Sequence, residues 1–193
     1  MAAIAAGVGA MLCISSSVAA MMMGGEETPA AATPTTPTTP SGPVLPKAQY
    51  VKVERPTGNY PGNIINLAEI EVFDKAGTNI ALNAVVTGGP DNHSSGPWAN
   101  LTDGDYANFA HTLGDGIAFM TIDLGAVKEI AKIVITNRAG GWGSGSTRME
   151  NATVTLLDAS QEDVKTTEAI VDAKLKMTYD FNVATPAWVY ADA

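Results

Sequence analysis

The segment from Asn100 to Asp105, with the sequence Asn-Leu-Thr-Asp-Gly-Asp, concentrates oxygen donors in a tight turn. Alternating aspartates around a glycine can wrap a calcium ion with side-chain carboxylates and backbone carbonyls, the oxygen ligands that Ca²⁺ prefers. A solvated Asp-Gly turn has the same spacing, and the spacing alone slightly favours it. The segment is not an EF-hand, because neither the twelve-residue pattern nor a helix follows.

Patterns typical of enzyme active sites are absent from the sequence. There is no Gly-x-Ser-x-Gly, and neither His93 nor His111 has a nucleophile partner in a motif. Gly140–Gly143 lacks the lysine and the helix that a phosphate-binding loop requires. No sequence feature marks a pair of catalytic carboxylates. The sequence therefore predicts a protein that is not an enzyme.

Charge and cysteine content restrict the partners. The 193-residue chain has a net charge of −9, and residues 47–193 hold 18 acidic against 11 basic side chains. Such an acidic surface repels phosphate backbones, so nucleic acid is not an expected partner. The single cysteine, Cys13, lies in the apolar N-terminal run, so the remainder has no disulfide. With two histidines and no cysteine in that part, a structural zinc site is close to excluded.

Residues 1–25 are predicted to be a membrane anchor. Ala2–Met23 is uncharged and 22 residues long, enough for a helix to cross a bilayer core of roughly 30 Å at about 1.5 Å per residue. Small residues recur four apart, as in closely packed membrane helices. The alternative is a cleaved signal peptide ending near Val18–Ala20, but the basic residues that usually open a signal peptide are missing.

Residues 26–46 are predicted to be an extended linker. Prolines recur at about every third position, as in Thr-Pro-Thr-Thr-Pro-Thr-Thr-Pro at 33–40. This spacing favours polyproline II, a stiff conformation that cannot build a core. A plain linker and an O-glycosylated stalk are equally consistent with it.

From residue 47 to 193 the sequence changes to short alternating runs broken by Gly, Asn, Asp and Pro. Such runs are typical of half-buried strands. About eight strands and no sustained helical period predict an all-β fold, an antiparallel sandwich or barrel. A weak helical turn is expected near Val127–Ala131, and a turn at Gly88–Asn92. The expected strands are 50–55, 68–73, 118–124, 132–137, 152–157, 164–170, 176–181 and 187–190.

Four segments together resemble the discoidin, or coagulation factor type C, superfamily of galactose-binding-like domains. They are Ile80–Ala84, interpreted as a strand that ends in a polar segment, and then Asn100–Asp105, Ile122–Gly125 and Ile133–Arg138. Within that superfamily the chain most resembles the F-type lectins, the fucose-binding branch. The resemblance runs from about Tyr50 to the C-terminus. It implies an antiparallel β-sandwich of the jelly-roll type, here preceded by the N-terminal hydrophobic helix.

The specific part of the resemblance is the lectin sugar motif. In that motif a His is followed after 26 residues by an Arg, then one residue, an Asp, four residues and a second basic residue. His111 and Arg138 match the first spacing, whereas the Asp position is Gly140 and Arg148 comes three residues late. The usual cysteines of that loop are replaced by Gly141-Trp142-Gly143.

The resemblance implies carbohydrate binding by His111, Arg138 and Arg148. Trp142 would be an apolar platform for the sugar or, alternatively, a contact to another protein. An equally weighted alternative is that His111 and Arg138 only stabilise the fold. Losing the Asp removes a group that would hold an arginine in place.

The same resemblance places a calcium site on Asn100, Asp103, Asp105 and Asn108. It shifts the interpretation of this turn slightly towards calcium, although no acidic ligand is evident near Trp188–Tyr190. Asn92, Asn100 and Asn151 begin N-glycosylation sequons. Glycosylation of Asn100 would conflict with calcium binding there.

Two functions from different classes remain open. The chain is expected to be a membrane-anchored recognition or assembly module at a cell surface, with a lectin-like domain that binds a glycan. Alternatively, it resembles minor capsid proteins of large DNA viruses. It would then pack against neighbouring structural subunits in a virion and connect the shell to an internal membrane. The absence of disulfides suits assembly in a reducing cytoplasm.

Overall fold

A computed structural model describes residues 42–56, 63–114, 116–139 and 145–192. The predicted anchor, residues 1–25, and most of the predicted linker lie outside these described residues. Within the described ranges, no helix is long and apolar enough to cross a membrane.

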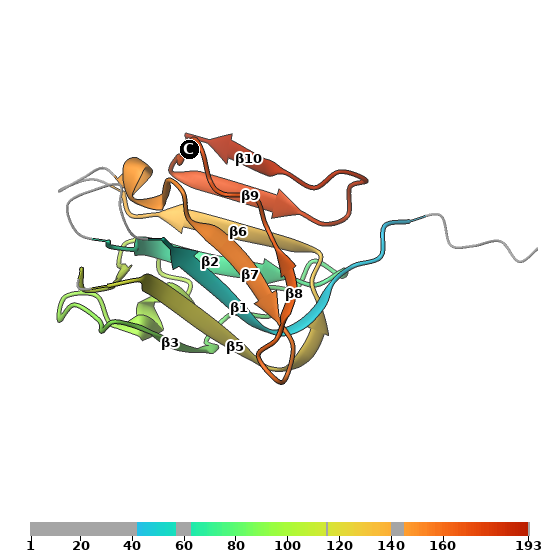
Figure 1. Cartoon of the computed structure of the whole chain (residues 1–193), viewed down its shortest axis with the longest axis horizontal. Helices are drawn as coiled ribbons and strands as arrows, with labels where there is room; N and C mark the ends of the chain where they lie inside the picture. The colour runs from blue at the N-terminus through green and yellow to red at the C-terminus, as the bar shows by residue number, and fades with distance from the viewer. Residues whose placement is uncertain (1–41, 57–62, 115, 140–144, 193) are drawn as a thin grey trace, which may run out of the picture. The chain divides into compact units, whose positions relative to one another are not determined.

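Two five-stranded antiparallel sheets form a β-sandwich, as the sequence predicted (Figure 1). The first sheet has the strand order β3-β5-β1-β7-β8 and the second β10-β9-β6-β2-β4. The strands of the first sheet are β3 (Val85–Gly89), β5 (Ala118–Glu129), β1 (Lys47–Arg55), β7 (Thr153–Leu157) and β8 (Asp163–Thr166). Those of the second are β10 (Trp188–Ala191), β9 (Lys176–Asp180), β6 (Lys132–Asn137), β2 (Asn66–Phe73) and β4 (Ala110–His111).

The core lies between the two sheets and follows from strand alternation. In β1, Val51 and Val53 are buried, while Lys52 and Glu54 point to the outer face. In β5, Met120 and Ile122 are fully buried. Their counterparts in the second sheet are Ile70 and Val72 of β2 and Ile133 and Ile135 of β6.

Strand β2 departs from simple alternation, because it is buried on both faces from Asn66 to Ile70. The register to β6 shifts between Leu67 and Glu69, which makes Ala68 the extra residue of a bulge. Leu67 and Ile70 both belong to the core, so Asn66 and Glu69 both lie on the outer face. The bulge therefore places two buried polar side chains on the same face of one strand.

Two 3-10 helices lie close to this outer-face region. Helix η1 (Trp98–Leu101) contacts β2, β3 and β4, and helix η2 (Gly145–Met149) contacts β2 and β6. Both helices therefore bring loop residues to the region around the bulge.

Three local expectations from the sequence are wrong. The helical turn expected near Val127–Ala131 is instead the end of β5, where Glu129 pairs with Lys47, and the link to β6. The strand expected at Ile80–Ala84 is a series of turns after an isolated bridge between Phe73 and Asn79.

The third error concerns Gly88 and Gly89, which lie inside β3 and not in a turn. A Cβ at Gly88 would lie 2.7 Å from the backbone carbonyl oxygen of Phe119 in β5. Close packing of the neighbouring strand therefore requires glycine here, although glycine usually indicates a turn.

Candidate functional site

His111 lies at the edge of the second sheet, where it pairs directly with Asn66 of β2. Its backbone N–H donates to the Gly96 carbonyl at 3.0 Å, and its carbonyl accepts from the His93 N–H at 2.8 Å. Both ring nitrogens are buried and have no hydrogen-bond partner among the described residues. The ring is therefore held in place by its backbone while its donor and its acceptor remain available.

The pKa of His111 is lowered to about 4. Burial is the largest cause, followed by the positive potential of His93, Arg148 and Arg138. The imidazole is consequently neutral at physiological pH, with one nitrogen as donor and the other as acceptor.

Arg138 and Arg148 lie together next to this histidine, although nine residues separate them along the chain. In the amide orientation that satisfies its hydrogen bonds, the Asn66 side-chain oxygen accepts from Nη1 of both arginines, at 3.2 Å each. The guanidinium of Arg138 also stacks over the Phe109 ring, 3.7 Å from its centroid, in a cation–π contact. We call Asn66, Phe109, His111, Arg138 and Arg148 the arginine site.

Three members of the arginine site, His111, Arg138 and Arg148, were predicted from the sequence, whereas Asn66 and Phe109 were not. Arg148 comes from η2 and lies beside Arg138, although its position in the sequence is three residues later than the motif requires. Asn66 precedes the recognisable segments, and no local signal in the sequence identifies it as the residue that joins the two arginines. Trp142, the fourth predicted residue, lies outside the described residues.

A third arginine lies nearby at the end of β1. Arg55 is only 1% exposed, and its Nη1 donates to the Ile64 carbonyl at 3.5 Å. Burial and the neighbouring Arg148 lower its pKa, while Glu150 raises it. Three guanidinium groups, those of Arg55, Arg138 and Arg148, therefore lie at this end of the sandwich, although the chain as a whole is acidic.

The predicted calcium residues also come together, in a loop that we call the acidic turn, residues 100–108. Asn108 donates its amide N–H groups to Oδ2 of Asp103 at 2.7 Å and, more weakly, to Oδ2 of Asp105 at 3.4 Å. Asn100 instead donates to the Phe109 carbonyl at 3.1 Å. A positively polarised donor thus lies between two carboxylates, the position that a cation would favour.

Glu69, which the sequence analysis missed, lies next to the acidic turn. Its side chain is fully buried, and Oε2 accepts from the Gly104 N–H at 3.2 Å. Oε1 of Glu69 and Oδ1 of Asn108 are buried oxygens without a partner among the described residues. Burial is the main cause that raises the pKa of Glu69 to about 7, with Asp103, Glu71 and Asp105 adding to it.

These oxygens are chemically suited to a hard cation, but their present arrangement is incomplete. Within the described ranges, no group of three or more His, Cys, Asp or Glu side chains is placed to hold a metal ion. A calcium ion would therefore also need amide and backbone oxygens, which are ordinary Ca²⁺ ligands.

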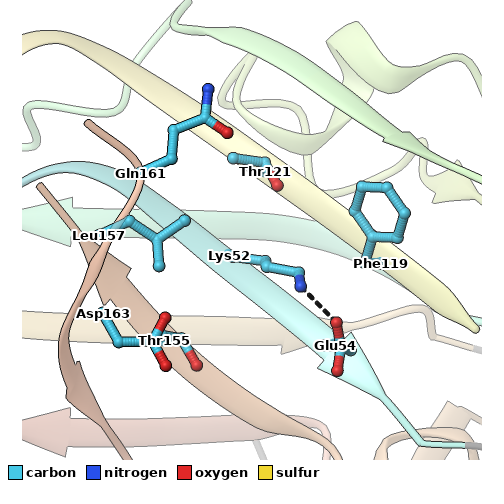
Figure 2. Close-up of a pocket in the computed structure, with 8 residues that line it drawn as sticks. All are labelled: Lys52, Glu54, Phe119, Thr121, Thr155, Leu157, Gln161 and Asp163. Atoms are coloured by element: carbon cyan, nitrogen blue, oxygen red, sulfur yellow. Dashed lines mark ion pairs between the residues drawn. The ribbon is translucent and has the colours of Figure 1, made fainter. Parts of the chain in front are cut away.

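A separate hollow lies on the outer face of the first sheet (Figure 2). Its volume is about 340 Å³. Lys52 and Glu54 form an ion pair there, and the Lys52 ammonium lies 5.3 Å from the centroid of Phe119. Other side chains of its lining are Thr121, Thr155, Leu157, Gln161 and Asp163.

The outer faces of the two sheets differ in their buried polar side-chain atoms that lack a hydrogen-bond partner. Among the described residues they belong to Glu69, Asn108, His111 and Asn137, all in or beside the second sheet, and to none of the residues that line the hollow. Buried polar atoms without partners are uncommon in folded proteins and often mark a ligand position. The second sheet is therefore the better candidate for the functional face.

Residues 100–188 match the family model of the NedA-like, galactose-binding domain of the F5/F8 type C group. The chain is similar to a galactose-binding-like domain of the discoidin superfamily. No curated protein and no solved structure matches it. The matched range contains the acidic turn, His111, Arg138 and Arg148, whereas Asn66 and Glu69 precede it.

Proposed function

We propose that the sandwich is a non-enzymatic carbohydrate-binding module, with the arginine site as its saccharide site. The observation that carries the proposal is the joint contact of Asn66 with Arg138 and Arg148, next to the two His111 ring nitrogens that have no hydrogen-bond partner among the described residues. Sugar hydroxyls both donate and accept hydrogen bonds. The neutral imidazole provides one group of each kind, and the guanidinium groups add donors in fixed directions.

The proposal is tested by calorimetric titration of the full chain with L-fucose and with D-galactose. Arg148→Gln is expected to weaken binding at least tenfold, because it removes charged donors while leaving the core untouched. Lys52→Gln, in the hollow of the first sheet, is the matched control and is expected to bind like the parent. Absence of binding at millimolar sugar, or loss of binding in Lys52→Gln alone, would contradict the proposal.

We propose further that Ca²⁺ binds at the acidic turn and stabilises the loop that leads into β4. The support is the pair of unpartnered buried oxygens on Glu69 and Asn108 beside Asp103 and Asp105. The ion would neutralise crowded carboxylates and would hold residues 100–108, which are followed directly by Phe109 and His111. Calcium would thus position the saccharide site without contacting the sugar.

Membrane attachment through residues 2–23 stays a proposal that the uncharged sequence supports. Fractionation of the expressed full chain, followed by carbonate extraction, tests it. Retention in the membrane pellet is expected for the full chain, and release is expected for a variant that begins at residue 40.

A further inference from the structure

The two arginines of the saccharide site are held by a neutral group. The Asn66 amide oxygen accepts from both guanidinium groups, but an amide carries no charge. A carboxylate at this position would both orient and neutralise the arginines. Because an asparagine orients them instead, Asn66 provides no negative charge to balance the two neighbouring guanidinium groups.

The surrounding residues supply little compensating negative charge. The ion pairs found within the described ranges are all formed by lysines, and none includes Arg138 or Arg148. Glu150 is close enough to raise the pKa of Arg55. The carboxylates of the acidic turn lie near the arginine site, but within the described ranges none of them forms an ion pair with Arg138 or Arg148.

His111, which lies next to both arginines, is subject to the same positive potential. Every charged neighbour that shifts its pKa is basic, namely His93, Arg148 and Arg138, and all three lower it. A field of this sign at a half-buried position is screened less by salt than one on an open surface. A ligand with negative charge at this position would therefore gain more than a neutral one.

We infer that the arginine site selects a saccharide that carries a carboxylate or a sulfate group, bound by Arg138 and Arg148 while His111 contacts the ring hydroxyls. This inference rests on the proposed carbohydrate function. Guanidinium groups match the planar or tetrahedral oxygens of such anions with paired hydrogen bonds. The net charge of −9 disfavours a polyphosphate chain, so the preferred ligand has isolated anionic groups on a sugar.

The test compares sugars with the same ring configuration that carry a hydroxymethyl, a carboxylate or a sulfate ester group at C6. Calorimetry measures binding of D-galactose, D-galacturonic acid and galactose 6-sulfate to the full chain, with sodium sulfate alone as the ion control. At least one anionic sugar is expected to bind about tenfold more tightly than galactose at low salt, and this ratio is expected to shrink as salt is raised. Comparing galacturonic acid with galactose 6-sulfate tells which anionic group is preferred.

A matched pair of amide-to-acid substitutions then tests the electrostatic cause. Asn66→Asp adds one negative charge between the arginines and is expected to abolish the preference for the anionic sugar. Gln161→Glu adds the same charge at an exposed position in the hollow of the first sheet and is expected to retain it. The salt dependence of the parent chain tests the same point without any substitution.

The outcomes separate this inference from the proposed function. Equal affinity for galactose and both anionic sugars would overturn the inference and leave the carbohydrate function standing. If sodium sulfate bound as tightly as galactose 6-sulfate, the site would be an anion site and the saccharide part would be wrong. If no sugar bound, the proposed function itself would fail.

Discussion

At the scale of single residues, Asn66 and His111 are the central pair. They are direct partners across β2 and β4, and each contributes something that the other lacks. Asn66 joins two arginines through one oxygen, and His111 presents two buried nitrogens without partners. A rigid pair of this kind reduces the ordering that ligand binding would otherwise require.

The depressed pKa of His111 leads to a prediction about acid stability. The unfolded chain protonates this histidine near its ordinary pKa of about 6.5, whereas the folded protein does so only near 4. Between these values the unfolded state binds more protons, so the His111 contribution to stability is present above about 6.5 and is lost as the pH falls towards 4. His111→Asn is expected to remove this contribution.

Because Glu69 also changes the stability with pH, the parent protein must be compared with the His111→Asn variant. Its pKa is raised to about 7, so the folded state binds more protons than the unfolded state between its ordinary pKa and 7. The contribution of Glu69 to stability therefore increases as the pH falls, whereas that of His111 decreases. Urea denaturation of parent and His111→Asn from pH 7 to 4 isolates the histidine, and parallel curves for the two chains would show that the prediction is wrong.

At the scale of elements, the site depends on how closely a loop approaches β4. Gly96 donates its N–H to the His93 carbonyl and accepts from the His111 N–H. A Cβ at Gly96 would lie 2.6 Å from Cβ and 2.8 Å from N of His111. Since the second of these atoms belongs to the backbone, only glycine allows the loop and the strand to lie this close.

Gly96→Ala is therefore expected to destabilise the domain by about 1–3 kcal/mol, the usual cost of overpacking, and to weaken sugar binding by displacing His111. Urea denaturation and calorimetry measure the two effects. Gly42→Ala is the matched control, because its new Cβ would have no atom within 4 Å. Equal stability of the two variants would contradict the close-approach argument.

At the scale of the whole molecule, the acidic turn and the arginine site are neighbours with opposite charge. Residues 100–108 lead directly into Phe109 and His111, and Glu69 and Asn66 lie on either side of the same bulge. If calcium orders the turn, its binding energy adds to the stability of the folded state and also stabilises the position of β4.

Calcium is accordingly expected to raise the melting temperature of the full chain, and a chelator is expected to reverse the effect. An ion at 100 times its Kd would add about 2.7 kcal/mol to stability. Glu69→Gln and Asp103→Asn are expected to lose the response. Asp158→Asn, in the distant turn before β8, is expected to keep it, and an equal response to Mg²⁺ would argue against a specific calcium site.

Much of the fold could be predicted from the sequence because alternation is a local property. Val51 and Val53 against Lys52 and Glu54 define a half-buried strand without reference to any other segment. The same locality explains the errors, since Gly88 and Gly89 resemble a turn until Phe119 is placed beside them. The end of β5 is a strand because Glu129 has Lys47 as its partner, and no local pattern specifies that partner.

For the candidate site, the sequence by itself determined the spacing of His111 and Arg138 and the cluster of oxygen donors at 100–108. Only the tertiary structure decided that Arg148 lies beside Arg138, that Asn66 joins the two and that Glu69 lies next to the acidic turn. The physical reason is that these contacts join residues distant in the chain. They depend on the β2–β4 register and on the bulge at Ala68, which together turn Asn66 and Glu69 to the same face.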